Sequence, residues 1–387
     1  MPFRFTTAGE SHGPGLTTIV EGVPAGLELD RDALDRDMAR RQLGHGRGGR
    51  MKIESDTVEI RSGVRHGRTL GSPIAILVAN RDYRNWEERM SPWPVNAAVE
   101  EVHLPRPGHA DLVGLQKYGH SDVRNVLERA SARETAARTA AGSIARAFLA
   151  ALGVRVHSHV VQIGSVRAPE REDLTAADFE QVDDDPVRCL DPEASAAMVE
   201  EIDRLRRENE SLGGSFEVRA FGLVPGLGSH VSWDQKLDGR LAQAIVSIQS
   251  IKGMTIGPAW EVAGSPGSEA HDEIFWSDER GYHRQTNRAG GLEGGMTNGQ
   301  PLVVRAAIKP ISTLTQPLRS VDTETKQPAE ALRERTDSTV VPAAAVVGEA
   351  MVCLTLAGAY REKLGGDHID DVLGALAAYK ERIGWKD

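Results

Sequence analysis

Residues 129–135, Arg-Ala-Ser-Ala-Arg-Glu-Thr, place two arginines around the start of a predicted helix. Ser131 and Glu134 have the spacing of a capping box, in which the serine hydroxyl accepts an early backbone N–H and the glutamate bonds back to the cap. A helix N-terminus attracts anions, and Arg129 and Arg133 add forked donors suited to phosphate or carboxylate. An anion site and a capped surface helix with two solvated arginines explain this segment equally well.

Two histidines have glycine neighbours: His12 within Gly-Glu-Ser-His-Gly (residues 9–13) and His120 within Tyr-Gly-His-Ser-Asp (residues 118–122). Histidine is the side chain best suited to proton transfer near neutral pH, and flanking glycines leave an imidazole accessible to a ligand. For each motif taken alone, a surface histidine in a turn is the commoner outcome. The two motifs therefore make His12 and His120 candidates for proton transfer.

A metal site would need these histidines together with four others: His103, His109, His157 and His159. The chain has no His-Glu-x-x-His and no Cys/His cluster, which argues against a metal site. Residues 44–49 and 290–295 are glycine-rich like phosphate loops. They lack the Gly-Lys-Ser/Thr of a P-loop and the strand–helix setting of a dinucleotide fold. The sequence therefore favours neither a metal site nor a Rossmann or P-loop fold.

Basic residues are concentrated between Arg36 and Lys52, although the whole chain has a net charge of −10. An acidic protein with focused basic loops is suited to capture a small, highly charged anion, whereas a general nucleic-acid binder needs a broad basic surface. An anion- or RNA-binding module built on this loop is the alternative hypothesis, although the loop has no interleaved aromatic residues. The basic residues of the loop are Arg36, Arg40, Arg41, Arg47, Arg50 and Lys52.

Two later segments also combine a cation with polar groups. Residues 309–313, Lys-Pro-Ile-Ser-Thr, end a predicted strand with a cation, backbone amides and two hydroxyls, which suits a phosphate group. An ordinary turn at the end of a strand explains them equally well. Residues 335–338, Arg-Thr-Asp-Ser, precede a predicted helix, where an arginine near an aspartate is usually a surface ion pair.

Segments typical of strands and helices alternate throughout the 387 residues, which predicts one compact α+β or layered α/β domain over residues 1–387. Residues 22–27 (Gly-Val-Pro-Ala-Gly-Leu) precede Asp30 and a predicted helix, and residues 222–227 (Gly-Leu-Val-Pro-Gly-Leu) precede Asp234 and another. This short echo could be chance. If it is real, it indicates a duplicated α/β unit with a central layer of helices.

The cysteines and the N-terminus indicate the compartment. Cys189 and Cys353 lie in no metal or redox motif, which fits a reducing cytoplasm. The first residues include no apolar signal region. The most apolar stretch, residues 340–356, is interrupted by proline, glycine and glutamate and is poorly suited to span a bilayer. We expect a cytoplasmic protein with no membrane or nucleic-acid partner.

Eight segments, in their usual order, resemble the motifs of chorismate synthases. The resemblance runs from residue 8 to near the last predicted helix, and eight motifs in order are far more specific than any one of them. The segments are Ala8-Gly-Glu-Ser-His-Gly13, Arg40-Arg-x-x-Gly-x-Gly-Arg47, Arg106-Pro-Gly-His-Ala-Asp111, Lys117-Tyr-Gly-His120, Glu128-Arg-Ala-Ser-Ala-Arg-Glu-Thr135, Asn287-x-Ala-Gly-Gly-x-x-Gly-Gly295, Lys309-Pro-Ile-Ser-Thr313 and Arg335-x-Asp337.

The resemblance implies a lyase that converts 5-enolpyruvylshikimate 3-phosphate to chorismate and phosphate by 1,4-anti elimination, the last common step of the shikimate pathway to aromatic amino acids. It implies that His12 protonates the departing phosphate, that His120 lies beside reduced FMN (FMNH2) and stabilises it, and that Asp337 acts with the flavin to remove the C6 proton. The substrate carries two carboxylates and a phosphate. The residues implied to bind it are Arg41, Arg47, Arg50, Arg106, Ser131, Arg133 and Arg335.

The resemblance also implies a flavin site and an assembly. Arg41 and Arg47 match positions linked with NADPH, although they could equally serve the substrate. No flavin-reductase segment is visible, so reduced FMN would come from an external reductant, with NADPH acting only indirectly. The residues implied to contact FMN are Arg129, Ala130, Ser131, Gln249, Ser250, Gly294, Lys309, Pro310, Ile311, Ser312, Thr313 and Arg335.

The implied fold is α+β: a layered β-α-β sandwich with internal pseudo-symmetry and antiparallel-rich sheets around a helical layer, assembled as a homotetramer.

A metal-dependent hydrolase that uses the histidines is a third hypothesis. Chelation of metal should abolish the activity of such a hydrolase and leave that of a flavin-dependent lyase intact.

Overall fold

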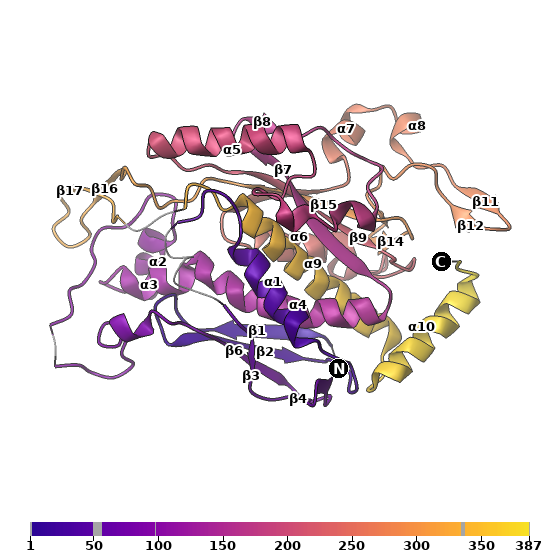
Figure 1. The fold of residues 1–387 in the computed structure, drawn as a ribbon, viewed down its shortest axis with the longest axis horizontal. Coiled ribbons are helices and arrows are strands. Elements are labelled where there is room, and N and C mark those ends of the chain that lie inside the picture. Colours follow the sequence, from indigo (N-terminus) through magenta and orange to yellow (C-terminus); the bar gives the residue numbers. More distant parts are fainter. Residues whose placement is uncertain (1, 49–55, 97, 334–336, 387) are drawn as a thin grey trace.

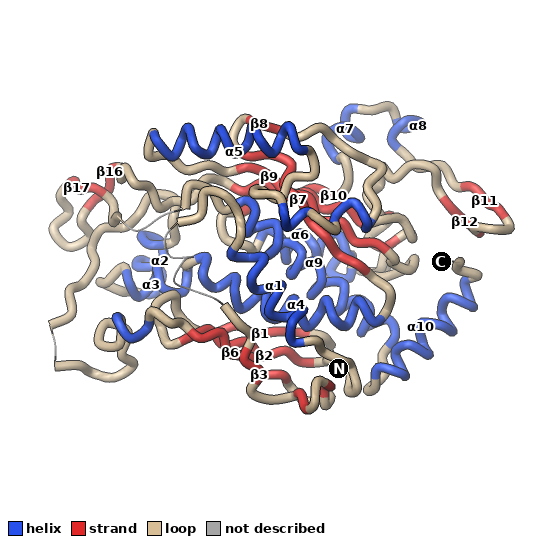
Figure 2. The backbone as a smooth tube through the Cα atoms, in the orientation of Figure 1, coloured by secondary structure: helices blue, strands red, loops and turns tan. Residues whose placement is uncertain are grey.

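The computed structural model describes residues 2–48, 56–96, 98–333 and 337–386, and its core is a layer of helices between two antiparallel sheets (Figures 1 and 2). The first sheet has the strand order β1-β2-β6-β3, and the second has the order β10-β15-β9-β7-β8. The strands of the first sheet are β1 (Arg4–Ala8), β2 (Gly15–Glu21), β3 (Glu59–Ile60) and β6 (Ile74–Ala79). Those of the second are β7 (Arg155–Ile163), β8 (Val166–Arg167), β9 (Gly214–Phe221), β10 (Ile251–Ile256) and β15 (Leu302–Ile308).

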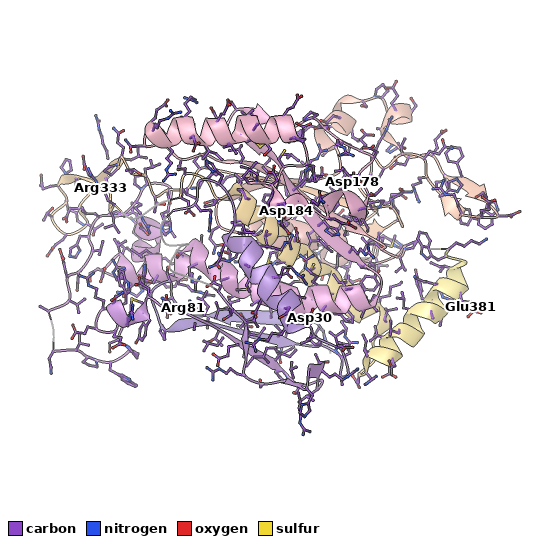
Figure 3. The ribbon with its side chains drawn as sticks, in the orientation of Figure 1. Asp30, Arg81, Asp178, Asp184, Arg333 and Glu381 are labelled. Carbon is purple, nitrogen blue, oxygen red and sulfur yellow. The ribbon has the colours of Figure 1, made fainter. Side chains whose placement is uncertain are left out.

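Four helices form the central layer: α1 (Arg31–Gln42), α4 (Thr135–Ala151), α6 (Leu237–Val246) and α9 (Val341–Leu364). Around the sandwich lie α2 (Asp111–Tyr118), α3 (Arg124–Ala130), α5 (Pro192–Arg207), α7 (Ala259–Gly264), α8 (Gly267–Ala270) and α10 (Ile369–Ile383). Four two-stranded hairpins are β4–β5 (Val64–Arg65, Arg68–Thr69), β11–β12 (Phe275–Ser277, Gly281–His283), β13–β14 (Leu292–Glu293, Met296–Thr297) and β16–β17 (Arg319–Val321, Pro328–Glu330). Charged side chains such as Asp30, Arg333 and Glu381 lie on the surface (Figure 3).

The two halves of the chain repeat one topology. In each half, four strands taken in chain order are arranged as first, second, fourth, third across the sheet, as β1-β2-β6-β3 and as β7-β9-β15-β10. A helix of the central layer follows the second strand of each half (α1 and α6), and another follows the fourth (α4 and α9). The echoed segments 22–27 and 222–227 both follow the second strand, and Gly22 and Gly222 both have positive φ, 81° and 78°. The predicted duplication, and the α+β sandwich with it, are therefore confirmed.

Helix α9 is the centre of this layer. It is apolar on all sides, as expected of a helix that is buried on all sides, and it packs on α1, α4, α6 and both β7 and β9. Among the described residues it is the one helix long and apolar enough to cross a membrane, but most of that stretch is buried inside the protein. Gly142 of α4 lies against Ala350 of α9, and Gly348 lies against the ring of Phe216. The absence of side chains at these glycines lets the helices and the second sheet approach closely.

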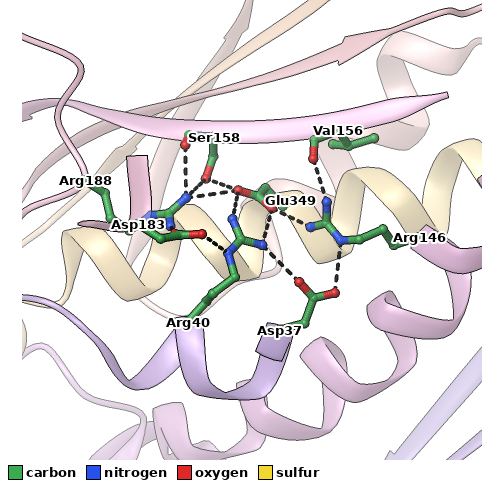
Figure 4. A network of polar contacts seen from close by, with 8 residues as sticks. All are labelled: Asp37, Arg40, Arg146, Val156, Ser158, Asp183, Arg188 and Glu349. Atoms are coloured by element: carbon green, nitrogen blue, oxygen red, sulfur yellow. Dashed lines mark hydrogen bonds and ion pairs between the residues drawn. The ribbon is translucent and has the colours of Figure 1, made fainter. Parts of the chain in front are cut away.

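A network of charges is buried beside α9 (Figure 4). The Glu349 carboxylate has no exposed surface and accepts hydrogen bonds from Arg40 Nη1 and Nη2, both at 2.9 Å, and from Arg188 Nη2 at 3.1 Å. Burial alone would raise the pKa of Glu349, but the surrounding arginines hold it well below its usual range. A buried charge is tolerated only when it is paired and hydrogen-bonded. The other members of the network are Asp37, Arg146, Ser158 and Asp183.

Candidate active site

Two adjoining cavities, of about 140 Å³ and about 360 Å³, lie where α4 and α9 begin. Both are lined by Ser131, Ala132, Gln249, Asp337 and Val340, so they share a wall. The start of a helix favours anions, because its first N–H groups have no partners within the helix. Since α4 and α9 are equivalent elements of the duplicated fold, both halves of the chain contribute to this one site.

Two buried arginines of the smaller cavity share one carboxylate. Arg41 Nη2 donates to Asp56 Oδ2 at 2.6 Å, and Arg133 Nη1 donates to the same oxygen at 2.7 Å. Burial alone would raise the pKa of Asp56, but the charges of Arg41 and Arg133 hold it below its usual value. Burial lowers the pKa of Arg41, and its Nε atom has no hydrogen-bond partner among the described residues. Two guanidinium groups on one carboxylate give the cavity wall a net positive charge that suits an anion.

Asp337 lies just before α9 and lines both cavities. Its Oδ1 accepts the backbone N–H of Gly48 at 2.5 Å, and its Oδ2 pairs with Arg47 Nη1 at 2.9 Å. The side chain of Asp337 is 21% exposed, so a ligand in the cavity can reach it. A carboxylate held in this way can accept a proton from a bound ligand.

His12 lines the larger cavity from the turn between β1 and β2. Its Nδ1 is 2.9 Å from Glu128 Oε1, and its backbone N–H donates to Glu128 Oε2 at 2.8 Å. Its ring lies 4.0 Å from that of Trp86, between centroids. The neighbouring Ser11 also lines the cavity and accepts a hydrogen bond from Ser131 Oγ at 3.2 Å. Long-range contacts to α3 and to the segment before α4 therefore fix the turn that carries His12.

His109 lines the same cavity just before α2. Its Nδ1 is 2.5 Å from Asp111 Oδ1, and Arg106 Nε donates to Asp111 Oδ2 at 2.8 Å. Burial alone would raise the pKa of Asp111, but the hydrogen bonds from His109 and Arg106 hold it well below its usual range. The larger cavity therefore contains two imidazoles, each with a carboxylate at Nδ1.

The second half of the chain also lines the larger cavity, with Gln249, Ser250, Lys309, Ile311, Ser312, Thr313, Asp337 and Val340. Burial and the nearby charge of Lys252 lower the pKa of Lys309. Gln249 Nε2 donates to Glu134 Oε2 at 3.1 Å, whereas its buried Oε1 has no hydrogen-bond partner among the described residues. A buried acceptor without a partner at a cavity wall is suited to a ligand that donates a hydrogen bond.

Most of the predicted site residues line one or both cavities. They are His12, Arg41, Arg47, Arg106, Ala130, Ser131, Arg133, Gln249, Ser250, Lys309, Ile311, Ser312, Thr313 and Asp337. Pro310 is not a lining residue, although both its neighbours are. Arg129 lines neither cavity and is exposed, and its guanidinium donates to the carbonyls of Thr7 and Gly9 and so supports the turn of His12. Arg50 and Arg335 lie outside the described residues.

Two predicted residues lie away from the cavities. His120 follows the end of α2, is exposed, and has its ring 6.2 Å from that of Tyr118, between centroids. Gly294 lies in the turn of the β13–β14 hairpin and lines neither cavity. The histidine that accompanies His12 in the cavity is His109, which the sequence analysis left unassigned. Its position within the motif of residues 106–111, next to a predicted ligand Arg106, was the signal for it.

The predicted capping box is also wrong in detail. Ser131 Oγ accepts from Arg133 N at 3.3 Å and so caps the short 3-10 turn of residues 132–134 rather than α4 itself. Glu134 does not bond back to the cap. Its carboxylate accepts hydrogen bonds from Thr7 at 2.8 Å and from Gln249 at 3.1 Å, which tie the two cavity walls together.

Three of the described arginines in the basic segment from Arg36 to Lys52 are paired with carboxylates, whereas Arg36 is exposed. Arg40 pairs with Glu349, Arg41 with Asp56 and Arg47 with Asp337. This arrangement does not offer the broad basic surface that RNA binding needs. Within the described part of the chain, no group of three or more His, Cys, Asp or Glu side chains is arranged to hold a metal ion.

Comparisons with known proteins show the family of the chain. The family model described as chorismate synthase matches residues 3–360. The chain is 58% identical to the chorismate synthase of Symbiobacterium thermophilum, over 98% of this chain and 99% of that one. It is also 58% identical to the chorismate synthase of Rubrobacter xylanophilus, over 99% of this chain and 98% of that one. A solved structure described as a crystal structure of chorismate synthase is 41% identical, covers 99% of this chain and 98% of its own, and superposes with a TM-score of 0.80. A site built from both halves of a duplicated α-layered fold, together with these full-length matches, shows that the chain belongs to the chorismate synthase family.

Proposed function

We propose that the two adjoining cavities are where this chain carries out the reaction of its family. The chain is a lyase that converts 5-enolpyruvylshikimate 3-phosphate to chorismate and phosphate. The observation that carries the assignment to this site is the convergence of arginines, two imidazoles and an accessible carboxylate on one connected space. A trianionic substrate needs cations to bind it, a proton donor for the leaving phosphate and a group to take the C6 proton.

Arg41 and Arg133 bind anionic groups of the substrate in the smaller cavity, and Arg106 binds such groups in the larger cavity. This proposal is supported by their burial and by the single carboxylate, Asp56, that two of them share. Forked guanidinium donors match the geometry of carboxylate and phosphate oxygens. Asp56 therefore holds the two arginines in position without neutralising both of them.

His12 donates a proton to the departing phosphate, and Asp337 removes the C6 proton. Both side chains line the larger cavity, and both are held by hydrogen bonds from distant parts of the chain. His109 takes the second imidazole role that the motif comparison had given to His120, because His109 lies in the cavity and His120 lies on the surface. An imidazole outside the cavity could not exchange a proton with a bound ligand directly.

The residues of the larger cavity fit reduced FMN. The unpaired Gln249 Oε1 is an acceptor for the N–H donors of a flavin ring, and Lys309, Ser312 and Thr313 are suited to its phosphate. The volume of about 360 Å³ lies within the range of roughly 300–1,000 Å³ of sites for small molecules and cofactors. When bound, reduced FMN supplies an electron-rich ring to a reaction with no net redox change. Gly294 remains a predicted contact that the cavity of this chain does not include.

The wider setting is also a proposal. The whole chain, residues 1–387, acts as one domain in the cytoplasm and assembles as a homotetramer. Reduced FMN comes from an external reductant, and NADPH takes part only indirectly. The shared hydrophobic core of the two sheets supports the single domain. The pairing of Arg41 and Arg47 with carboxylates at the cavities supports a small-molecule substrate rather than nucleic acid as the partner of this segment.

The test is an anaerobic assay of phosphate release from 5-enolpyruvylshikimate 3-phosphate with added reduced FMN. We expect turnover by the unmodified protein, a severe loss for His12→Ala and for Asp337→Ala, and folded protein in both variants by circular dichroism. Loss of a general acid or base typically slows turnover by about 10²–10⁴. His159→Ala, which removes an imidazole from outside the two cavities, is the control and should turn over normally. Normal turnover of the His12 and Asp337 variants would reject their roles.

A further inference from the structure

The Glu128 carboxylate holds His12 by two different groups of that residue. Glu128 Oε1 and Oε2 lie 2.9 and 3.1 Å from His12 Nδ1, and Oε2 also accepts the backbone N–H of His12 at 2.8 Å. The side chain of Glu128 is only 3% exposed, and Arg124 Nη1 donates to it at 2.8 Å. Burial alone would raise the pKa of Glu128, but its hydrogen bonds with His12 lower it, so this carboxylate is ionised at neutral pH.

The face of the His12 ring is fixed as well. The indole of Trp86 lies 4.0 Å from the imidazole between centroids, and the guanidinium of Arg124 lies 5.0 Å from the centre of the same indole. Trp86 Nε1 donates to Asp82 at 3.1 Å. Because Glu128 holds Nδ1 and Trp86 covers one face of the ring, the imidazole is fixed in orientation at the cavity wall.

The same arrangement occurs at the second imidazole of the cavity. His109 Nδ1 is 2.5 Å from Asp111 Oδ1, and Asp111 is in turn held by Arg106. Each imidazole is thus paired at Nδ1 with a buried carboxylate that an arginine orients. A carboxylate at one ring nitrogen fixes the tautomer of a histidine and favours its protonated form.

We propose that Glu128 is the positioning residue for His12: it holds Nδ1–H, fixes the orientation of the ring at the cavity wall and stabilises its imidazolium form by direct ion pairing. The proposal rests on the role of His12 as proton donor proposed above. Other charged or titratable groups also act on His12. Glu10 lies in the same turn, Arg124 lies on α3, and Arg106, His109, Lys309 and Asp337 line the cavity around it. Arg106, Arg124 and Lys309 are cations, and Glu128 is the carboxylate in direct contact with the ring.

The first test is the pH dependence of kcat for Glu128→Gln, measured anaerobically with reduced FMN. The amide keeps the shape of the side chain and removes its charge, so the limb at which activity falls with rising pH should move to lower pH by about one unit or more. Activity at the acid end of the profile should recover toward that of the unmodified protein, with KM little changed. Glu128→Asp, which keeps the charge, should restore the limb in part.

Glu217→Gln is the matched control. Glu217 is another buried carboxylate that faces an imidazole, 3.4 Å from His159 Nε2, and it lies on the outer face of the second sheet away from both cavities. Its variant should leave the pH profile in place. A uniform fall in kcat at every pH for Glu128→Gln, with the limb unmoved, would overturn the proposal, because that is the result of a merely structural defect.

The second test uses the protein without substrate and so does not depend on catalysis. With ¹⁵N-labelled histidine, and His12→Gln to assign its signals, NMR should show His12 with its proton on Nδ1 in the neutral form. Protonated imidazole quenches a neighbouring indole, so the fluorescence lost in Trp86→Phe should report the same titration, shifted to lower pH by Glu128→Gln. A neutral His12 protonated at Nε2, or a titration that Glu128→Gln leaves in place, would overturn the proposal. A shifted titration with an unshifted kcat profile would uphold the pairing and reject His12 as the proton donor.

Discussion

Replacement of Glu349 by glutamine should destabilise the protein by about 3–5 kcal/mol, the usual cost of removing one partner from a buried ion pair. The Glu349 carboxylate accepts five hydrogen bonds, from Arg40 Nη1 and Nη2, Arg146, Arg188 and Ser158. Hydrogen bonds to charged groups contribute about 1.5–3 kcal/mol each and are not additive. The amide can accept some of these bonds, but its NH2 group faces guanidinium donors, and three buried cations lose their central counter-charge.

The measurement is the free energy of unfolding in urea at fixed protein concentration, because an oligomer gains stability by mass action. Glu362→Gln is the control on the same helix: it breaks a surface pair with Arg240 and should cost less than about 1 kcal/mol. A loss below about 1 kcal/mol for Glu349→Gln would show that the network is not what stabilises the helical layer.

The pH dependence gives an independent check. Because the pKa of Glu349 is lowered in the folded protein, the stability that it contributes is present above the unfolded-state value of about 4.3 and is lost as the pH falls below it. One such group contributes up to about 1.4 kcal/mol per pH unit to that loss. The acid limb of the stability curve should therefore be shallower in Glu349→Gln than in the unmodified protein. An unchanged slope would contradict the charged state of this buried carboxylate.

Three other predictions follow from single contacts. His109→Ala should lower kcat by about 10²–10⁴, while His120→Ala should leave it unchanged; equal losses in the anaerobic phosphate assay would place both rings in the site. Gly142→Ala should lower the stability by about 1–3 kcal/mol, because its methyl group has no room against α9; an unchanged melting temperature would contradict that packing. Burial raises the pKa of Cys189 to about 11 and that of Cys353 to about 12. Ellman's reagent at pH 8 should therefore label neither thiol until urea is added. Rapid labelling of the native protein would refute the burial of the two thiols.

The sequence predicted the elements of the site better than its contacts. The segment 129–135 does lead into a long helix, and Ser131 and Arg133 do line a cavity. The capping box failed because Glu134 has better partners than the local backbone, from β1 and from the second half of the chain. A local rule cannot weigh such partners, since Thr7 and Gln249 become neighbours of Glu134 only when the fold closes.

The choice between the histidines shows the same limit. His109 and His120 stand on either side of α2, and both have a glycine as one chain neighbour. Which of them enters the cavity depends on how α2 packs, and its own eight residues do not determine that. Asp56 and Glu128 were missed for a related reason: their partners Arg133 and His12 are 77 and 116 residues away in the chain. The duplication could be predicted, because positions that need positive φ are occupied by glycine at the same place in both halves, and this repeat is visible in the sequence itself.

The position of α9 has a consequence for how this chain is made. Residues 341–364 are synthesised after every strand of both sheets, yet the helix that they form packs at the centre of the helical layer, against α1, α4 and α6 and against β7 and β9. Until it emerges, α1, α4 and α6 cover only part of the inner faces of the completed strands. The nascent chain therefore carries exposed apolar surface until this segment has been made, and such surface is prone to non-native association during synthesis.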